Sequence, residues 1–161
     1  LAIPHMRGQR WGKIINVTSV GGLMAMPYGG WYHATKFAVE GLTHSLRQEL
    51  APFDVDAILV RPGAIKTEWG DIAVENLSKV SRDGPYAPAV RSMHQLFSSP
   101  RVENMAADPS VIADVVEKAI TAARPKNAYV ARRAAGIMLA VSRFIGNDAF
   151  NRMFMKLPRK M

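Results

Sequence analysis

The stretch VDAILVRPG, residues 55–63, decides the fold of this chain. It is apolar on both faces of an extended chain, which is typical of a strand buried in a parallel sheet, and Pro62-Gly63 ends it. A second such run, KIINVT, lies upstream at residues 13–18. Residues 31–50, between the two runs, have the pattern of a helix. A strand, a crossover helix and a strand predict a right-handed βαβ unit with parallel pairing.

The rest of the chain continues this alternation. Asp108-Pro109 is a good helix start, because an aspartate caps and a proline fits the first helical position. NAYVA at 127–131 predicts a short third strand, and residues 134–157 predict one or two amphipathic helices. Residues 64–107 form a long connection without strong periodicity, in which we expect short helices. The order predicts an α/β fold, the second half of an open parallel sheet.

Composition excludes several classes of function. The 161 residues contain no cysteine, so disulfides and thiolate chemistry are excluded, and a cytoplasmic location fits. The four histidines have no metal-ligand spacing, so we expect no metal site. The net charge of +8 is spread along the chain without interleaved aromatic residues, so we expect no nucleic-acid binding.

Three residues form a candidate site for acid-base chemistry. Tyr32 and Lys36 lie four residues apart and so share one face of the predicted helix. A free phenol loses its proton only near pH ~10. An ammonium about 5 Å away, at an effective dielectric constant of about 20, stabilises a phenolate by roughly 3 kcal/mol and favours proton exchange with an alcohol or ketone. Ser19, just past the first strand, can donate a hydrogen bond to the same carbonyl oxygen.

Each residue also has an ordinary interpretation. A tyrosine and a lysine at this spacing occur by chance in many helices, and Ser19 could be a loop residue or a helix cap. A Pro-Gly pair after a strand is usually only a turn. The hypothesis of a site therefore rests on the order and spacing of all of these residues together.

INVTSVGG, then YHATK, then VRPGAIKTEW resemble motifs of the classical short-chain dehydrogenase/reductase family in their order and spacing. The resemblance covers about residues 1–131. It implies a Rossmann fold, here the C-terminal part of a doubly wound parallel sheet. Residues 1–131 would be a partial NAD(P)-binding domain that carries the catalytic motif, and residues 132–161 a helical extension of it.

The family resemblance also implies roles for single residues. Tyr32 would be the catalytic acid and base, Lys36 would assist it and hold the nicotinamide ribose, and Ser19 would polarise the substrate carbonyl. Other residues would contact the cofactor, NAD or NADP: Pro62, Gly63, Ile65 and Thr67. The protein would then be an oxidoreductase that interconverts an alcohol and a ketone or aldehyde by hydride transfer.

Several parts of the family pattern are absent from these residues. The glycine-rich cofactor turn, the residue that selects the cofactor, the NNAG strand and the asparagine of the catalytic tetrad should all precede residue 1. The chain begins in mid-pattern and without methionine, so we expect a fragment. We expect residues 1–161 alone to bind no dinucleotide tightly and to be inactive. A truncated or non-catalytic relative that acts as a binding or dimerisation module is the alternative.

The substrate and partners are less constrained. A set of apolar residues in the long connection suggests a lipophilic substrate, as in the steroid- and retinol-oxidising branch: Trp69, Tyr86, Met93, Leu96 and Phe97. Lys66 and Arg82 could instead meet an acidic group. Small residues on helix 31–50 would allow pairing in a homo-oligomer, although the same pattern suits packing against the sheet. The basic, amphipathic tail, residues 134–161, leaves contact with a membrane surface open.

Overall fold

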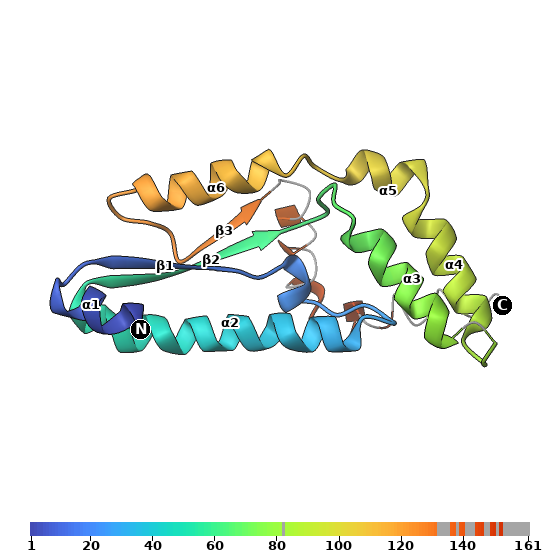
Figure 1. Ribbon diagram of the computed structural model, residues 1–161, viewed down its shortest axis with the longest axis horizontal. Coiled ribbons are helices and arrows are strands. Elements are labelled where there is room, and N and C mark those ends of the chain that lie inside the picture. The colour runs from blue at the N-terminus through green and yellow to red at the C-terminus, as the bar shows by residue number, and fades with distance from the viewer. Residues whose placement is uncertain are drawn as a thin grey trace.

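The computed structural model describes residues 1–81, 83–131, 136–137, 139–140, 144–146, 149–150 and 152. A parallel sheet in the order β1-β2-β3 forms its centre (Figure 1). The three strands lie where the sequence predicts them: β1 Gly12–Val17, β2 Val55–Pro62 and β3 Ala128–Ala131. Val17 pairs with Val60, and Pro62 with Ala131, so the carboxyl ends of all three strands lie at one edge of the sheet.

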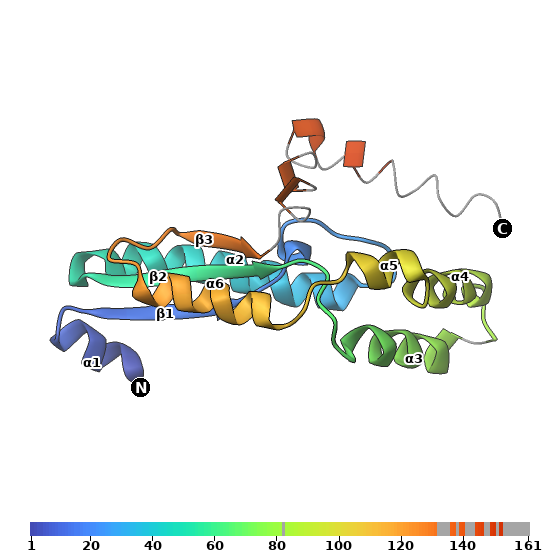
Figure 2. The ribbon, with the colours of Figure 1, turned by 90° about the horizontal axis from the view of Figure 1, so that it is seen from above.

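Two long helices cover opposite faces of the sheet. Helix α2, Gly30–Leu50, lies below the strands in Figure 1, and α6, Ser110–Thr121, lies above them. Figure 2 shows the same arrangement from above, with α6 in front of the strands and α2 behind them. Both predicted helices are confirmed. The remaining helical elements before β2 in the sequence are short: α1 Ala2–Gly8, η1 Val20–Gly22 and η2 Ala51–Phe53.

The core is centred on β2. Ile58, Leu59 and Val60 are almost completely buried, and burial of each such side chain stabilises the fold by about 1.5–3 kcal/mol. Strand β1 differs, because it pairs only with β2 and most of its residues are half-exposed. Its outer edge is therefore an open edge of the sheet within the described residues.

Helix α2 turns a largely polar face toward the sheet. His33, Glu40 and Thr43 are buried, whereas Phe37 and Leu42 are exposed. The small residues of the predicted stripe are exposed as well: Ala34, Ala38, Gly41 and Ser45. The alternative that this stripe packs against the sheet is therefore wrong. Its partner, if it has one, lies outside these residues.

The long connection is more regular than its sequence indicates. It contains α3 Trp69–Ser81, α4 Ala87–Phe97 and α5 Pro100–Met105. The expected helices are present, and two of them are longer than the weak periodicity suggested. An isolated β-bridge between Ile65 and Ala107 joins the two ends of this helical segment, residues 65–107, which we call the excursion. The three helices extend beyond the carboxyl ends of the strands (Figure 1).

Helix α6 is held at both ends by side chains. The Asp108 carboxylate accepts a hydrogen bond from the Ser110 backbone N–H at 2.9 Å. The helix begins at Ser110 and its N-cap residue is Pro109, so the prediction that Asp108 is the cap and Pro109 the first helical residue is wrong by one position. At the other end, the Lys13 ammonium donates to the carbonyls of Ile120 and Ala122, both at 2.6 Å. A cation at this position satisfies free carbonyls and complements the helix dipole. The lysine thereby joins β1 to α6.

The described part of the C-terminal segment packs against the turn after β1. Leu139 and Phe150 are buried with Met24, and Val20 and Leu23 pack against this cluster. Phe144, by contrast, is 93% exposed. All described positions from 136 to 152 are helical, as expected. Arg82, which the sequence analysis named as a possible partner of an acidic group, lies outside the described residues.

Candidate active site

The predicted tyrosine and lysine lie together at the amino end of α2. The Lys36 Nζ is 5.9 Å from the centre of the Tyr32 ring and donates a hydrogen bond of 3.4 Å to the Val17 carbonyl at the end of β1. Both side chains are partly exposed. The ammonium is thus fixed by the strand end and lies beside the phenol ring.

Ser19 lies in the connection between β1 and α2, residues 18–29, which we call the Ser19 turn. Part of this turn packs against Tyr32. The Ser19 hydroxyl accepts the Gly21 backbone N–H at 3.0 Å and caps η1. A methyl group at Gly21 would lie 3.1 Å from the Tyr32 ring, so the turn and the ring are in close contact. The structure therefore brings Ser19, Tyr32 and Lys36 to one end of the sheet, as the sequence predicts.

The first helix of the excursion, α3, begins at Trp69, which contacts Tyr32. The centres of the Trp69 and Tyr32 rings are 4.7 Å apart, and Trp69 remains half-exposed. Further out, Tyr86 at the start of α4 meets Tyr28 edge to face at 6.3 Å. Partly exposed aromatic side chains therefore lie at the start of α3, against the Tyr32 ring, and at the start of α4.

The predicted cofactor residues follow β2 in one continuous segment. Pro62 and Gly63 are half-buried at the strand end, Ile65 is in the bridge to Ala107, and Thr67 is exposed. The segment ends at Trp69 against the tyrosine. The structure places these residues along the base of the excursion.

The site fits the nicotinamide end of a dinucleotide. An ammonium has three donors, and the contact with Val17 uses one of those of Lys36, which leaves others for ribose hydroxyls. The strand ends beside it are the place where open α/β sheets bind ligands.

A buried ion pair near the site was missed in the sequence. Arg61 of β2 and Glu40 of α2 are both more than nine-tenths buried and form two hydrogen bonds. Arg47, about two turns after Glu40 on α2, donates a hydrogen bond to the Ala57 carbonyl at 2.8 Å. Burial, and then the charge of Arg61, lower the pKa of Arg47, whereas Glu40 raises it. The arginine within VDAILVRPG was the available signal, since an arginine in a buried strand requires a partner.

A second residue missed in the sequence is His33, which follows Tyr32. Its ring is buried and contacts the Ser19 turn through both nitrogens. In the sequence it is one of four scattered histidines, so nothing distinguished it.

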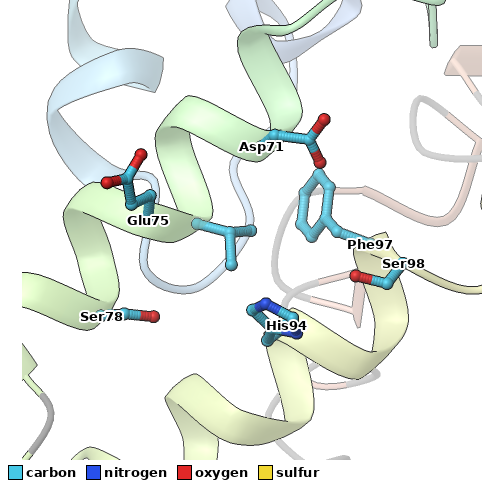
Figure 3. Close-up of a pocket in the computed structure, with 7 residues that line it drawn as sticks. Asp71, Glu75, Ser78, His94, Phe97 and Ser98 are labelled. Atoms are coloured by element: carbon cyan, nitrogen blue, oxygen red, sulfur yellow. The ribbon is translucent and has the colours of Figure 1, made fainter.

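Two cavities lie at opposite ends of the molecule. One, of about 300 Å³, lies between α3 and α4 and has both carboxylate and aromatic lining (Figure 3): Asp71, Val74, Glu75, Ser78, His94, Phe97 and Ser98. The other, of about 490 Å³, lies where β1 begins and α6 ends, and Trp11, Asp56 and Ile120 are among its lining. The first cavity lies at the same end of the sheet as Tyr32, because α3, which lines it, begins at Trp69, and Trp69 contacts Tyr32.

None of the described helices has the length and apolar character needed to span a bilayer. The described residues also contain no group of three or more histidine, aspartate or glutamate side chains arranged to hold a metal ion.

The sequence is similar to those of known short-chain dehydrogenases and reductases. The sequence profile described as short chain dehydrogenase matches residues 1–77. The 3-ketodihydrosphingosine reductase of Bacteroides thetaiotaomicron is 49% identical over 69 residues, which is 43% of this chain and 26% of that protein. Retinol dehydrogenase 8 of Bos taurus is 32% identical over 126 residues, 76% of this chain and 40% of that protein.

The fold is that of solved short-chain dehydrogenases. The enzyme from Streptomyces avermitilis superposes with a TM-score of 0.68 at 24% identity, over 98% of this chain and 55% of that one. Solved relatives in this family contain NAD or NADP. The chain spans between about a quarter and about half of the length of the curated relatives it matches. Motifs, fold and relatives agree: the chain belongs to the classical short-chain dehydrogenase/reductase family.

Proposed function

We propose that these residues are the catalytic part of an NAD(P)-dependent oxidoreductase that interconverts a ketone or aldehyde and the corresponding alcohol. The observation that supports this most strongly is the convergence at one sheet end of a phenol, an ammonium 5.9 Å from its ring and the turn capped by Ser19. Groups of these types, within reach of one bound carbonyl oxygen, are those that proton transfer and charge stabilisation require.

In the direction of reduction, a nicotinamide cofactor held at this site would supply the hydride for the carbonyl carbon. The Tyr32 hydroxyl donates its proton to the carbonyl oxygen, so the two transfers give the alcohol and a phenolate. Lys36 stabilises that phenolate and holds the nicotinamide ribose, and the Ser19 hydroxyl donates a hydrogen bond to the same oxygen. Water returns the proton to Tyr32. Oxidation of an alcohol follows the same steps in reverse.

Pro62, Gly63, Ile65 and Thr67 would line the nicotinamide pocket. They occupy the segment between the end of β2 and Trp69, which contacts the tyrosine ring. The sequence contains no glycine-rich cofactor turn, so we propose that this chain alone neither binds the dinucleotide tightly nor reduces a substrate.

The substrate is proposed to be lipophilic. The Trp69 ring is half-exposed and contacts the Tyr32 ring, and the exposed rings of Tyr28 and Tyr86 contact each other. Two relatives, a 3-ketodihydrosphingosine reductase and a retinol dehydrogenase, are named for lipophilic compounds, which supports a lipophilic substrate.

A homo-oligomer formed through α2 is the proposed assembly. The outward stripe of small residues permits close approach of a second helix, and Leu42 beside it is 64% exposed. Burial of this surface against a second copy would remove apolar side chains from water.

Transfer of deuteride tests the function directly. The full-length protein is incubated with NADPH or NADH deuterated at the transferred position, together with a panel of long-chain ketones, retinal and steroid ketones. We expect deuterium on the carbinol carbon of a lipophilic alcohol, detected by mass spectrometry. Absence of deuterated alcohol from every carbonyl compound with both cofactors would contradict the proposal.

A further inference from the structure

We propose that His33 is a positioning residue: it fixes the Ser19 turn against Tyr32 by two hydrogen bonds from a single imidazole tautomer. The kinetic part of this inference rests on the proposed function, whereas the hydrogen bonds do not. His33 follows Tyr32 on α2, and only 5% of its surface is exposed.

The two bonds of the ring determine where its proton lies. The Met26 backbone N–H points at Nε2 from 3.0 Å, so Nε2 must accept. The Gly21 carbonyl, 2.8 Å from Nδ1, can only accept, so Nδ1 must carry the proton. Both bonds exist together only in the neutral ring protonated at Nδ1.

These bonds connect the catalytic helix to the catalytic serine. The Gly21 carbonyl accepts the hydrogen bond from the Nδ1–H of His33, and the Gly21 N–H donates to the Ser19 hydroxyl at 3.0 Å. One residue of the turn therefore links Ser19 to the neighbour of Tyr32. Met26, five residues further along the turn, is held by the other nitrogen.

The turn is shaped to admit this ring. A methyl group at Gly21 would come within 3.1 Å of Nδ1, and one at Gly29 would come within 3.0 Å of Nε2. Both distances are shorter than ordinary contacts of a side-chain carbon. The imidazole thus fills the space between two glycines, and the Tyr32 ring lies against it, with ring centres 5.5 Å apart.

Substitutions can separate the two bonds. His33→Asn places an amide NH₂ where Nδ1 lies, so it keeps the bond to Gly21 and loses the bond to Met26. His33→Gln reaches the Nε2 position, so it keeps an acceptor for Met26 and loses the bond to Gly21. His33→Ala loses both, and His5→Ala, at an exposed position on α1, is the control.

The first measurement is the tautomer in the full-length protein, read from long-range ¹H–¹⁵N NMR correlations of histidine-labelled samples. We expect His33 to carry its proton on Nδ1 alone, and the exposed His5 to show both tautomers. We also expect the amides of Gly21 and Met26 to exchange with deuterium faster in His33→Ala, while those of β2 keep their protection. A proton on Nε2, or unchanged exchange at both amides, would overturn the inference.

The second measurement separates positioning from a merely structural role. We expect His33→Ala to lower kcat about ten- to a hundredfold with unchanged affinity for NADPH, because a displaced Ser19 no longer meets the carbonyl oxygen. His33→Asn should recover most of kcat, and His33→Gln should not. Equal activity of the Asn and Gln variants, or wild-type kcat in His33→Ala, would contradict positioning through Gly21. If the wild-type protein reduces no carbonyl compound, the proposed function fails, and the tautomer and amide exchange alone decide this inference.

Discussion

Arg61 of β2 holds Glu40 of α2 in a two-pronged ion pair, with Nε–Oε1 and Nη2–Oε2 distances of 2.9 and 2.7 Å. Glu40 lies one turn after Lys36, and Arg61 precedes Pro62 at the strand end. The pair therefore sets the position of the helix that carries Tyr32 relative to the strand end that would meet the cofactor.

Loss of one partner of this pair should be strongly destabilising. Glu40→Gln leaves the Arg61 charge buried without its counter-ion, which typically costs about 3–5 kcal/mol. We expect the free energy of unfolding to fall by about this amount in urea titrations. The double variant Glu40→Leu, Arg61→Met should be less destabilised than either single variant, because apolar side chains can replace a buried pair.

The matched control is Glu75→Gln. Glu75 also pairs with a cation, Lys79, at 2.8 Å, but both side chains are more than three-fifths exposed. The urea midpoint of this variant should match that of the wild type. An equal loss of stability in Glu40→Gln and Glu75→Gln would show that burial of the Glu40 pair has no energetic weight.

The sequence was sufficient for the strands because the residues of a buried parallel strand are recognisable by themselves. VDAILVRPG became β2 and KIINVT became β1 within one residue at each end. The grouping of Ser19, Tyr32 and Lys36 was also predictable, since their order follows from the βαβ connection.

Tertiary partners could not be predicted in the same way. Periodicity shows which residues of α2 share a face, but not that the sheet takes the polar face with Glu40 and Thr43. That choice depends on Arg61 and on Asn16, which donates to the Thr43 hydroxyl at 2.9 Å. The bonds of His33 likewise depend on a turn whose path is set by two glycines.

The hydrogen bond that Ser110 donates to Asp108 at the start of α6 should make the stability of the fold depend on pH. The backbone N–H and the hydroxyl of Ser110 hold the pKa of Asp108 below its usual range. The ionised carboxylate therefore stabilises the fold above the usual carboxyl pKa, and this contribution is lost as the pH falls through the lowered value in the folded protein. We expect Asp108→Ala to be less stable than the wild type at neutral pH, with a gap that narrows in acid.

Thermal unfolding at several pH values measures this gap. Asp108→Asn, which keeps an acceptor for the Ser110 N–H but not the charge, should lie between the two. A gap between Asp108→Ala and the wild type that stays constant from neutral pH to pH ~2 would contradict the assignment.

The outward stripe of α2 predicts how the full-length protein assembles. Ala38→Arg places a long, charged side chain in the middle of the stripe, where two helices would approach most closely. We expect the wild type to be an oligomer and Ala38→Arg to be a monomer in analytical ultracentrifugation, with an unchanged circular dichroism spectrum. Gln48→Arg, at an exposed position at the far end of the helix, should leave the oligomer intact. A monomeric wild type, or an oligomeric Ala38→Arg variant, would exclude this interface.

The most direct test of the central claim is the rate of NAD(P)H oxidation by the full-length Tyr32→Phe variant with a carbonyl substrate that the wild type reduces. The phenylalanine keeps the ring that packs on Trp69 and Gly21 and removes only the hydroxyl that would transfer the proton. The account predicts a kcat lower by about 10²–10⁴-fold with unchanged cofactor affinity. A Tyr32→Phe variant with wild-type kcat would contradict it.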